Sequence, residues 1–150
     1  MVKSSNNKNN SLLQKKLKHA RLVQDSLFKI TEAAHKTTNM DDLYKSIHKI
    51  INKLMYTKNF YIAIYDEKDN MLHFPYGVDS KDKETINPPM KLNKKSFTGR
   101  CMQKGIPLLY YQKEAKELMQ RNQIDKKCYD SRTKVWLGTP LKIGKKTIGV

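Results

Sequence analysis

The sequence predicts an α+β fold, in which a mainly antiparallel sheet is flanked by helices and is preceded by a long N-terminal helix. Apolar residues recur at helical spacing through much of the first third of the chain. Short apolar strands follow in closely connected pairs, and strands joined by tight turns run antiparallel. The last pair, within 135–150, reads as strand, tight turn and strand, and it ends in the middle of an apolar pattern.

The composition allows one domain with its own core. The 150 residues are 38% hydrophobic and 29% charged, and a chain of this length can bury a sizeable core. Residues 1–10 are mostly Lys, Asn and Ser, which bury too little apolar surface, so we expect a disordered N-terminus. We expect residues 11–36 to form a signalling or dimerisation helix and residues 37–150 to form the globular domain.

The net charge of +16 is the main indication of a charged partner. Such a charge attracts nucleic acid, anionic membrane surfaces and acidic ligands. The lysines occur as scattered pairs on different elements, whereas a nucleic-acid groove more often has Arg-rich clusters with interleaved aromatic residues. We therefore favour a solvated basic surface, and a basic nucleic-acid-binding domain is the alternative function.

Cysteine usage and hydropathy predict a cytoplasmic protein. Cys101 and Cys128 lie far apart and form no CxxC pair or metal-ligand cluster, which fits a reducing compartment. The N-terminus lacks the apolar core of a signal peptide, and no apolar run approaches membrane-spanning length. A membrane anchor elsewhere in a longer parent protein is left open.

The first helix is expected to begin at Ser11, a good N-cap, and to carry an apolar stripe. The apolar residues of this stripe recur at alternating spacings of three and four, with Lys, Arg, Gln and Glu around them. They are Ala20, Val23, Leu27, Ile30 and Ala34. Packing against the helix's own domain and pairing in a homodimer both fit this stripe, and both can hold at once.

A second helix is predicted from Asn39, an N-cap followed by two acidic residues in the first turn. Its apolar stripe runs from Leu43 to Leu54. If residues 60–65 are extended, the side chains on both faces are apolar. This pattern predicts a central strand that is buried on both faces. A polar turn leads to a second strand at 71–76, and a long polar loop follows over 77–95.

Capping and turn residues define the remaining elements. A short helix begins at about Ser96 and is closed by Gly105, which suits a left-handed C-terminal position. A strand at 106–111 and a helix at 113–121 follow, and residues 122–134 are polar and loop-like. In the closing hairpin, Gly144 suits the first central position of a two-residue turn.

The order of these elements, together with several short motifs, resembles a GAF domain over roughly residues 26–150. The matching segments are the helix 43–55, the strand and turn 60–66, and residues 74–76, 96–101, 105–108, 136–141 and 148–150. Residues 96–108 resemble the family's run of glycine, arginine and then glycine-x-proline-leucine, and 136–150 resembles its x-P-L and x-x-I-G-V ending. The sequences of segments 59–63 and 74–76 are most similar to those of bacterial GAF domains that lie upstream of diguanylate cyclase or phosphodiesterase modules or of sensor histidine kinases.

This resemblance implies a six-stranded, mainly antiparallel sheet with helices on both faces and a small-molecule pocket under loops and short helices. It implies a sensory or regulatory domain of a bacterial signal-transduction protein, which binds a small molecule, dimerises, or does both to control a covalently linked output module. It also implies that the chain stops before its last strand ends and before the C-terminal helix. A degenerate GAF domain used only for dimerisation is a further alternative.

Candidate ligand-binding residues lie on the strands and on the elements expected around the pocket. Pockets for small molecules are mostly apolar with a few polar groups. The candidates are Tyr61, Ala63, Tyr76, Phe97, Cys101, Trp136 and Thr139. Filling the core is the alternative role of these side chains, since aromatic residues favour half-buried strand surfaces.

The sequence contains no GxSxG, P-loop or HExxH pattern, so we expect a fragment without catalytic activity. The four histidines show no ligand spacing on one face, and no metal is expected. Asn52, Phe60 and Asp66 resemble part of the cyclic-nucleotide motif of some GAF domains, but their spacing differs. Neither cysteine has the neighbouring histidine common in bilin-binding members. No bilin is therefore expected, and the ligand stays unknown.

Overall fold

The computed structural model describes residues 3–80 and 88–150, with side chains from residue 10 onward. The chain divides into two compact units, Met1–Phe60 and Tyr61–Val150. The second helix packs against the first within the first unit, and the domain boundary expected at residue 37 stays a prediction. The α+β class that the sequence predicts is confirmed by the order of helices and strands.

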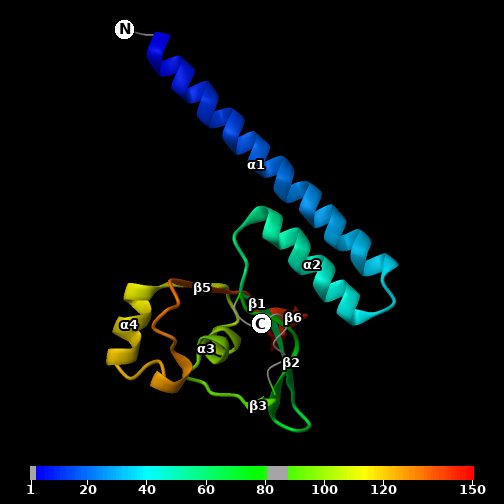
Figure 1. Ribbon diagram of the computed structural model, residues 1–150, viewed down its shortest axis with the longest axis vertical. Coiled ribbons are helices and arrows are strands. Elements are labelled where there is room, and N and C mark those ends of the chain that lie inside the picture. Colours follow the sequence, from blue (N-terminus) through cyan, green and yellow to red (C-terminus); the bar gives the residue numbers. More distant parts are fainter. Residues whose placement is uncertain (1–2, 81–87) are drawn as a thin grey trace. The chain divides into compact units, whose positions relative to one another are not determined.

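The first unit is a hairpin of two helices (Figure 1). Helix α1 (Lys3–Lys36) and helix α2 (Met40–Leu54) are joined by residues 37–39. Asn39 caps α2 as predicted, because its side chain accepts a hydrogen bond from the Asp41 backbone N–H at 2.9 Å. At 1.5 Å per residue, α1 is about 51 Å long and α2 about 22 Å. Helix α2 is therefore too short to cover more than about half of α1.

Helix α1 begins at Lys3, earlier than the N-cap predicted at Ser11. Residues 3–10, which were expected to be disordered, are therefore helical in the structure. They contain no Gly or Pro. Extending an existing helix by one residue is much easier than nucleating a helix, so a polar composition alone does not stop α1.

The second unit contains a five-stranded sheet in the order β3-β2-β1-β7-β6 and a two-stranded sheet of β4 and β5. The strands of the larger sheet are β1 (Phe60–Asp66), β2 (Met71–Val78), β3 (Met90–Lys91), β6 (Leu141–Ile143) and β7 (Lys146–Gly149). The smaller sheet pairs β4 (Leu108–Tyr111) with β5 (Val135–Gly138) in antiparallel fashion.

The single six-stranded sheet that we expected is thus wrong in its details. The chain leaves β5 and enters β6 through Thr139 and Pro140, and proline lacks the N–H that a continuous ladder requires. The short strand β3 falls in the predicted loop 77–95 and pairs with Met71 and Leu72. Residues 81–87 of that loop lie outside the described residues.

The closing hairpin has the predicted turn. Ile143 pairs with Lys146, and Gly144 between them has a φ of 59°, a left-handed conformation that glycine adopts without strain. Strand β7 then lies against β1, where Val150 and Ala63 exchange two backbone hydrogen bonds of 2.8 Å. A Cβ on Gly149 would lie 2.3 Å from the Ala63 carbonyl oxygen, so this close pairing needs glycine.

Helices α3 (Phe97–Lys104) and α4 (Gln112–Gln120) confirm the two helices predicted here, and a short 3₁₀ helix spans Lys126–Cys128. The Ser96 hydroxyl accepts a hydrogen bond from the Gly99 N–H, and Gly105 ends α3 in the left-handed conformation. Two buried clusters form the core of this unit. They are Phe97, Ala115 and Ile124, and Cys101, Leu108 and Val150. No helix in the described parts of the chain has the length and hydrophobicity that crossing a membrane requires.

Candidate functional site

The candidate site is built around Tyr61 on the central strand β1. The Trp136 indole Nε1–H donates a hydrogen bond to the Tyr61 hydroxyl at 3.1 Å. The same hydroxyl lies 2.8 Å from the Thr98 Oγ1. Because Tyr61 accepts from Trp136, its own proton is available to Thr98. We call these three residues the Tyr61 network.

Burial is the main cause of a raised pKa for the Tyr61 phenol, and the hydrogen bonds from Thr98 and Trp136 oppose this shift. The phenol is therefore neutral over the physiological range. A neutral phenol both accepts and donates, which is the state that the Tyr61 network requires.

Trp136 also belongs to an aromatic stack with Phe97 and Tyr110. Its ring centroid lies 5.3 Å from that of Phe97 and 6.2 Å from that of Tyr110, and the planes are nearly parallel in both pairs. Tyr110 and Trp136 are direct cross-strand partners in the β4–β5 ribbon. Offset aromatic pairs at such distances stabilise a core beyond simple area burial.

Arg100 fixes the outer side of the aromatic stack. Its Nε–H donates to the Tyr110 hydroxyl at 3.3 Å, and its Nη1 donates to the Gln123 carbonyl at 3.1 Å. Because Arg100 lies one helical turn after Phe97 on α3, the two side chains reach the stack together. A cationic group therefore lies at the rim of a mainly aromatic site.

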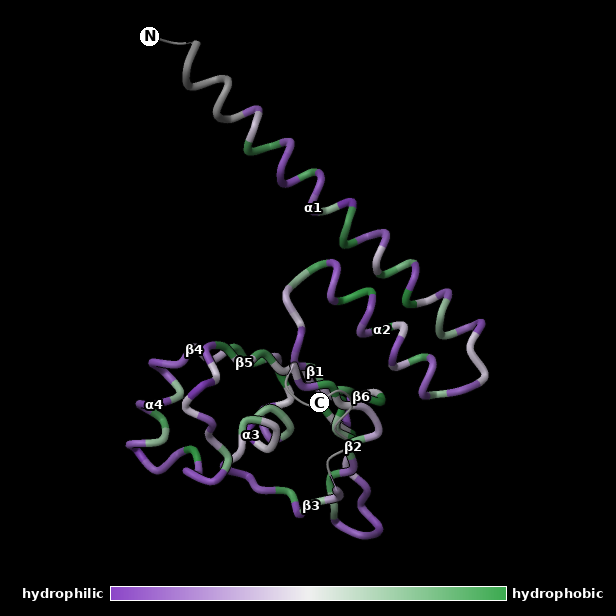
Figure 2. The backbone as a smooth tube through the Cα atoms, in the orientation of Figure 1, coloured by the Kyte–Doolittle hydropathy of each residue, from purple (hydrophilic) through white to green (hydrophobic). Residues whose placement is uncertain are grey.

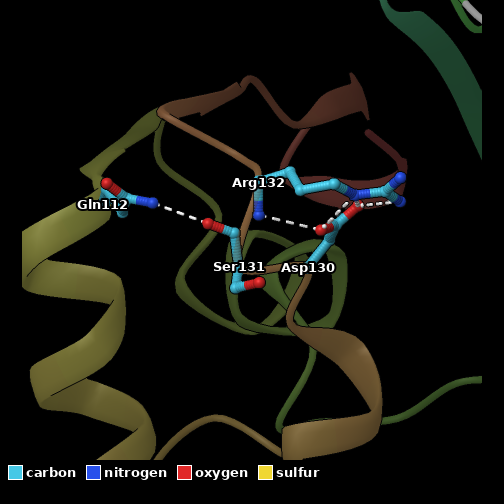
Figure 3. Close-up of polar contacts among 4 residues, drawn as sticks. All are labelled: Gln112, Asp130, Ser131 and Arg132. Carbon is cyan, nitrogen blue, oxygen red and sulfur yellow. Dashed lines mark hydrogen bonds and ion pairs between the residues drawn. The ribbon is translucent and has the colours of Figure 1, made fainter.

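The loop that leads into β5 is held by α4 (Figure 3). The Gln112 side-chain amide donates to the Ser131 carbonyl at 2.6 Å, and the Gln112 backbone N–H donates to the Lys134 carbonyl at 2.9 Å. Within the loop, Arg132 and Asp130 form an exposed ion pair with a closest distance of 2.7 Å. These contacts set the path of the chain just before Trp136.

The buried Tyr129 hydroxyl has no hydrogen-bond partner among the residues that the structure describes. Tyr129 packs against the cluster of Phe97, Ala115 and Ile124, beside Trp136. Buried hydroxyls are rarely left unsatisfied, so an orphan of this kind indicates a bound water or a polar ligand atom.

A surface groove of about 270 Å³ adjoins the stack through Tyr110. Leu109, Tyr110 and Leu118 supply its apolar lining, and charged side chains of α4 and its C-terminal end supply the rest. These charged residues are Glu114, Glu117 and Arg121. The groove thus offers carboxylates and one guanidinium beside an apolar floor.

Both cysteines are free thiols. Cys101 is fully buried, its Sγ donates to the Ile106 carbonyl at 3.6 Å, and burial raises its pKa. Cys128 lies 3.3 Å from the Asn93 amide nitrogen, and burial followed by the nearby Asp125 charge raises its pKa as well. A raised pKa lowers the thiolate fraction at neutral pH, so neither thiol is activated as a nucleophile.

The structure brings together four of the seven residues predicted to bind a ligand. Tyr61, Phe97 and Trp136 belong to the Tyr61 network and the stack, and Trp136 packs against the cluster of Cys101. Ala63 has no exposed surface. Tyr76 is half-buried on β2, and Thr139 is exposed after β5.

Sequence reasoning missed Thr98, Arg100 and Tyr110 at this site. Thr98 is 37 residues from Tyr61, and Trp136 is 75 residues away. Nothing local to Thr98 marks it. Tyr110 could have been found from the predicted strand, because every second side chain of a strand lies on the same face. Tyr110 therefore shares a face with Leu108, an apolar residue expected in the core.

Sequence reasoning also missed a group of Asp66, Asp69 and His73, whose possible ligand atoms lie within 4.8 Å of one another. In the structure these side chains serve the turn between β1 and β2. Asp66 and Asp69 accept backbone N–H groups of Lys68 and Met71, and His73 lies 2.7 Å from Asp69. The turn accounts for this arrangement, and we assign it a structural role.

The sequence matches no family model and no curated protein. Solved structures share its fold. The GAF domain of A. aeolicus nlh2 in an inactive state is 18% identical, with a TM-score of 0.59 over 89% of this chain and 76% of that one.

The GAF domain of the Acinetobacter phosphoenolpyruvate-protein phosphotransferase is 13% identical, with a TM-score of 0.62 over 84% of this chain and 72% of that one. Residues 122 to 287 of a methyl-accepting chemotaxis protein are 14% identical, with a TM-score of 0.58 over 83% and 78%. At these identities the similarity concerns the fold. The chain therefore has the fold of a GAF domain, as its sequence motifs predicted.

Proposed function

We propose that this chain is a non-catalytic sensory or regulatory domain of a bacterial signalling protein, which acts in the cytoplasm. It binds a small molecule, dimerises, or does both, and it controls a downstream output module such as a diguanylate cyclase or a histidine kinase. The fold that it shares with GAF domains and with part of a chemotaxis protein supports this proposal. The feature that carries the proposal furthest is the exposed apolar surface of α1.

The least exposed side chains in the C-terminal half of α1 follow helical spacing. Val23, Ile30 and Ala33 are half-buried, and Ser26 is buried with its hydroxyl donating to the Leu22 carbonyl. Helix α2 packs along α1 in this unit. Two residues of the predicted dimerisation stripe, Val23 and Ile30, thus belong to the face that α2 occupies.

A second stripe on α1 remains exposed. Its members recur at spacings of four and three over three heptads: Leu13, Leu17, Ala20, Gln24, Leu27, Thr31 and Ala34. Leu13, Leu17 and Leu27 are 66%, 53% and 61% exposed. Gln24 and Thr31 are its polar members, and Figure 2 shows hydrophobic positions recurring among hydrophilic ones along α1. We call this set the exposed stripe.

The exposed stripe is the surface that we assign to a second copy of this chain. Apolar residues at heptad spacing are typical of coiled-coil pairing, and identical helices present the same spacing to each other. The stripe retains Ala20, Leu27 and Ala34 of the predicted dimerisation residues. It extends them towards the N-terminus, beyond the length that α2 can cover.

The charge of α1 predicts how this association responds to salt. The helix carries eight Lys or Arg residues and two Asp or Glu residues. Two such helices side by side repel each other, and salt screens that repulsion. Dimerisation therefore strengthens as the salt concentration rises.

Leu17→Glu places a charge in the exposed stripe, and Leu22→Glu is the matched control on the same helix outside the stripe. We expect Leu17→Glu to weaken dimerisation at least tenfold, since it buries a charge in an apolar seam. The Leu22→Glu variant should stay within about threefold of the wild type. Sedimentation equilibrium at low and high salt measures both, and equal association of Leu17→Glu and wild type would refute the proposed interface.

A nucleic-acid-binding role, the alternative that the +16 charge supports, predicts the opposite salt dependence. Oligonucleotide affinity falls with salt, with a slope of about one per phosphate contacted. The same salt series with a labelled oligonucleotide separates the two functions. No binding at low salt removes the nucleic-acid alternative.

Ligand binding is proposed at the aromatic site with the orphan Tyr129 hydroxyl and the adjoining groove. A molecule that binds only the folded state raises the melting temperature. A thermal-shift screen with metabolites and nucleotides tests this proposal. A molecule that binds at this site should also quench the fluorescence of Trp136. A complete screen without a hit favours the degenerate domain that only dimerises.

A further inference from the structure

We propose that the free edge of strand β4, together with the groove beside it, binds an extended segment of a partner protein by strand addition. The segment has an apolar residue flanked by one basic and one acidic residue. All the contacts that carry this inference lie within the second unit, Tyr61–Val150. The inference rests on the proposed binding role of the groove, and it names the class of partner that the groove takes.

Among the described strands, β4 pairs only with β5. In an antiparallel pair, directly opposite residues alternate between those that exchange backbone hydrogen bonds and those that do not. The Gln112 N–H donates to the Lys134 carbonyl at 2.9 Å, and these two residues are the next opposite pair after Tyr111 and Val135. Leu109 is an odd number of positions from Gln112, so it belongs to a pair that exchanges no bonds. Its backbone N–H and C=O therefore point away from β5, towards the free edge.

The positions on either side of Leu109 along this edge are already bonded or lack a donor. The Tyr111 N–H donates to the Glu114 carboxylate at 3.0 Å, and Tyr111 is the N-cap of α4, whose carbonyl accepts the first bond of that helix. Pro107 has no backbone N–H. Leu109 is thus the position at which the edge offers both a donor and an acceptor. Unpaired groups of this kind are a template for a further strand, and antiparallel pairing is the commoner kind.

The groove of about 270 Å³ lies beside this free edge. Its lining residues come from β4, from α4 and from the C-terminal end of α4, whereas β5 lies on the other side of β4. Leu109 and its cross-strand partner Leu137 share a face of the β4–β5 ribbon and are 47% and 52% exposed. The residue of an added strand that lies opposite Leu109 points to this same face. We therefore assign an apolar residue to the centre of the segment.

The two residues that flank the central one point to the opposite face of the ribbon, which is the face of Tyr110. Helix α4 lies on this face, because Tyr110 and Leu118 both pack against the cluster that contains Ala115. Glu117 and Arg121 line the groove from α4 and its C-terminal end. The flanking side chains of the segment are thus directed towards these two charged groups.

Glu117 and Arg121 set the charges of the flanking residues. Neither side chain forms an ion pair with another of the described residues. They are four positions apart, which places their Cβ atoms about 5–6 Å from each other. Alternate residues of a strand are about 6.5 Å apart, so the two flanking side chains match this spacing. One of them is therefore basic and the other acidic. Such a segment is neutral, and the net charge of +16 does not repel it as a whole.

The first arm of the test uses an acetylated and amidated peptide, Ser-Thr-Lys-Val-Glu-Thr-Ser, added to the full chain at physiological salt. We expect a Kd of about 1 mM or below and slower amide hydrogen exchange at Leu109. The matched control peptide is N-methylated at its valine, which removes the N–H that bonds the Leu109 carbonyl. It should bind about tenfold more weakly, because that carbonyl is left unpaired. NMR titration measures both affinities.

The second arm tests the contact between the peptide lysine and Glu117 with a double-mutant cycle. Glu117→Gln, and separately the replacement of the peptide lysine by glutamine, should each weaken binding about threefold, as expected for an exposed ion pair. The two changes together should cost no more than either alone, because they remove the same contact. Glu67→Gln is the matched control, since Glu67 is an exposed carboxylate of the same unit outside the groove. It should change the affinity by less than about 1.5-fold.

The proposal is overturned if the peptide does not bind, if its N-methylated form binds within about twofold of it, or if the two changes of the cycle add. Protection of Leu109 that rises with protein concentration, without peptide, would assign the edge to a second copy of the chain. Equal binding of free lysine would assign the groove to a small charged molecule. Either result also overturns strand addition by a partner.

None of these outcomes alters the tests of the proposed function. Association through α1 is measured by sedimentation, and ligand binding at the aromatic site is measured by the quenching of Trp136. Peptide binding is observed at Leu109 and Glu117. Failure of strand addition is therefore distinguishable from failure of the proposed sensory function.

Discussion

At the scale of single residues, Tyr61 combines a buried ring with a hydroxyl that has two hydrogen-bond partners. Its hydroxyl accepts from Trp136 and lies within hydrogen-bond distance of Thr98. Without that oxygen, the Trp136 N–H and the Thr98 hydroxyl each lose a partner in a partly buried site. Leaving buried donors unpaired costs more free energy than the net value of the bonds that are lost.

Tyr61→Phe should lower the free energy of unfolding by about 1–3 kcal/mol at pH 7, because it leaves these groups unpaired. Urea denaturation followed by Trp136 fluorescence measures the change. Tyr65→Phe, with its exposed hydroxyl, should change stability by less than about 0.5 kcal/mol. Equal effects of the two substitutions would contradict the importance of the Tyr61 network.

The raised pKa of Tyr61 predicts a pH dependence with a definite sign. Its contribution to stability is fully present below the ordinary tyrosine pKa of about 10, where both states hold the proton. As the pH rises above that value and through the raised folded-state pKa, the unfolded state ionises first and the contribution is lost. The difference in the free energy of unfolding between wild type and Tyr61→Phe should therefore narrow as the pH rises above about 10. A constant gap would count against burial of the phenol.

At the scale of helices and strands, caps and turns were predicted more accurately than the pairing of distant segments. The N-caps Asn39 and Ser96, the left-handed Gly105 and the turn at Gly144 all lie where the sequence placed them, because each acts within four residues of its partner. The pairing of β3 and the division of the sheet depend on contacts between distant segments. The same limit applied to Thr98 and Tyr110, whose role at the site depends on strands that meet only in the folded chain.

Gly149→Ala should destabilise the β1–β7 pair by more than about 3 kcal/mol, because the new Cβ would meet the Ala63 carbonyl oxygen at 2.3 Å and the backbone would have to move. Gly144→Ala is the matched control. Its Cβ meets nothing within 4 Å, and its cost of about 1–2 kcal/mol comes from the left-handed φ alone. Thermal unfolding of both variants measures the difference, and similar losses would contradict the close pairing.

At the scale of the whole molecule, the charge of +16 opposes compact folding through self-repulsion. The ion pairs Lys146–Glu67 and Lys36–Glu32 do little to offset it, since both are exposed. Exposed pairs contribute about 0–1 kcal/mol each. The basic surface is therefore a general electrostatic property of the chain, and screening should act on it directly.

Raising NaCl from about 10 to 300 mM should stabilise the protein by on the order of 1 kcal/mol, because the Debye length falls from about 30 Å to below 8 Å. For a chain of this size that is a rise in melting temperature of about 2–4 °C. Scanning calorimetry on the Leu17→Glu variant separates this effect from salt-driven association. A fall in melting temperature with salt would show that specific ion pairs outweigh the net repulsion.

The length of α1 also gives the molecule a mechanical property. A helix of about 51 Å acts as a lever: a rotation of roughly 5° about its C-terminal end moves its other end by about 4 Å. That displacement is transverse to the helix axis, and it is close to half of the roughly 8–10 Å that separates the axes of two packed helices. An angular change too small to rebuild the α1–α2 contacts is thus amplified, at the N-terminal part of α1, into a change large enough to separate α1 from a helix packed against it.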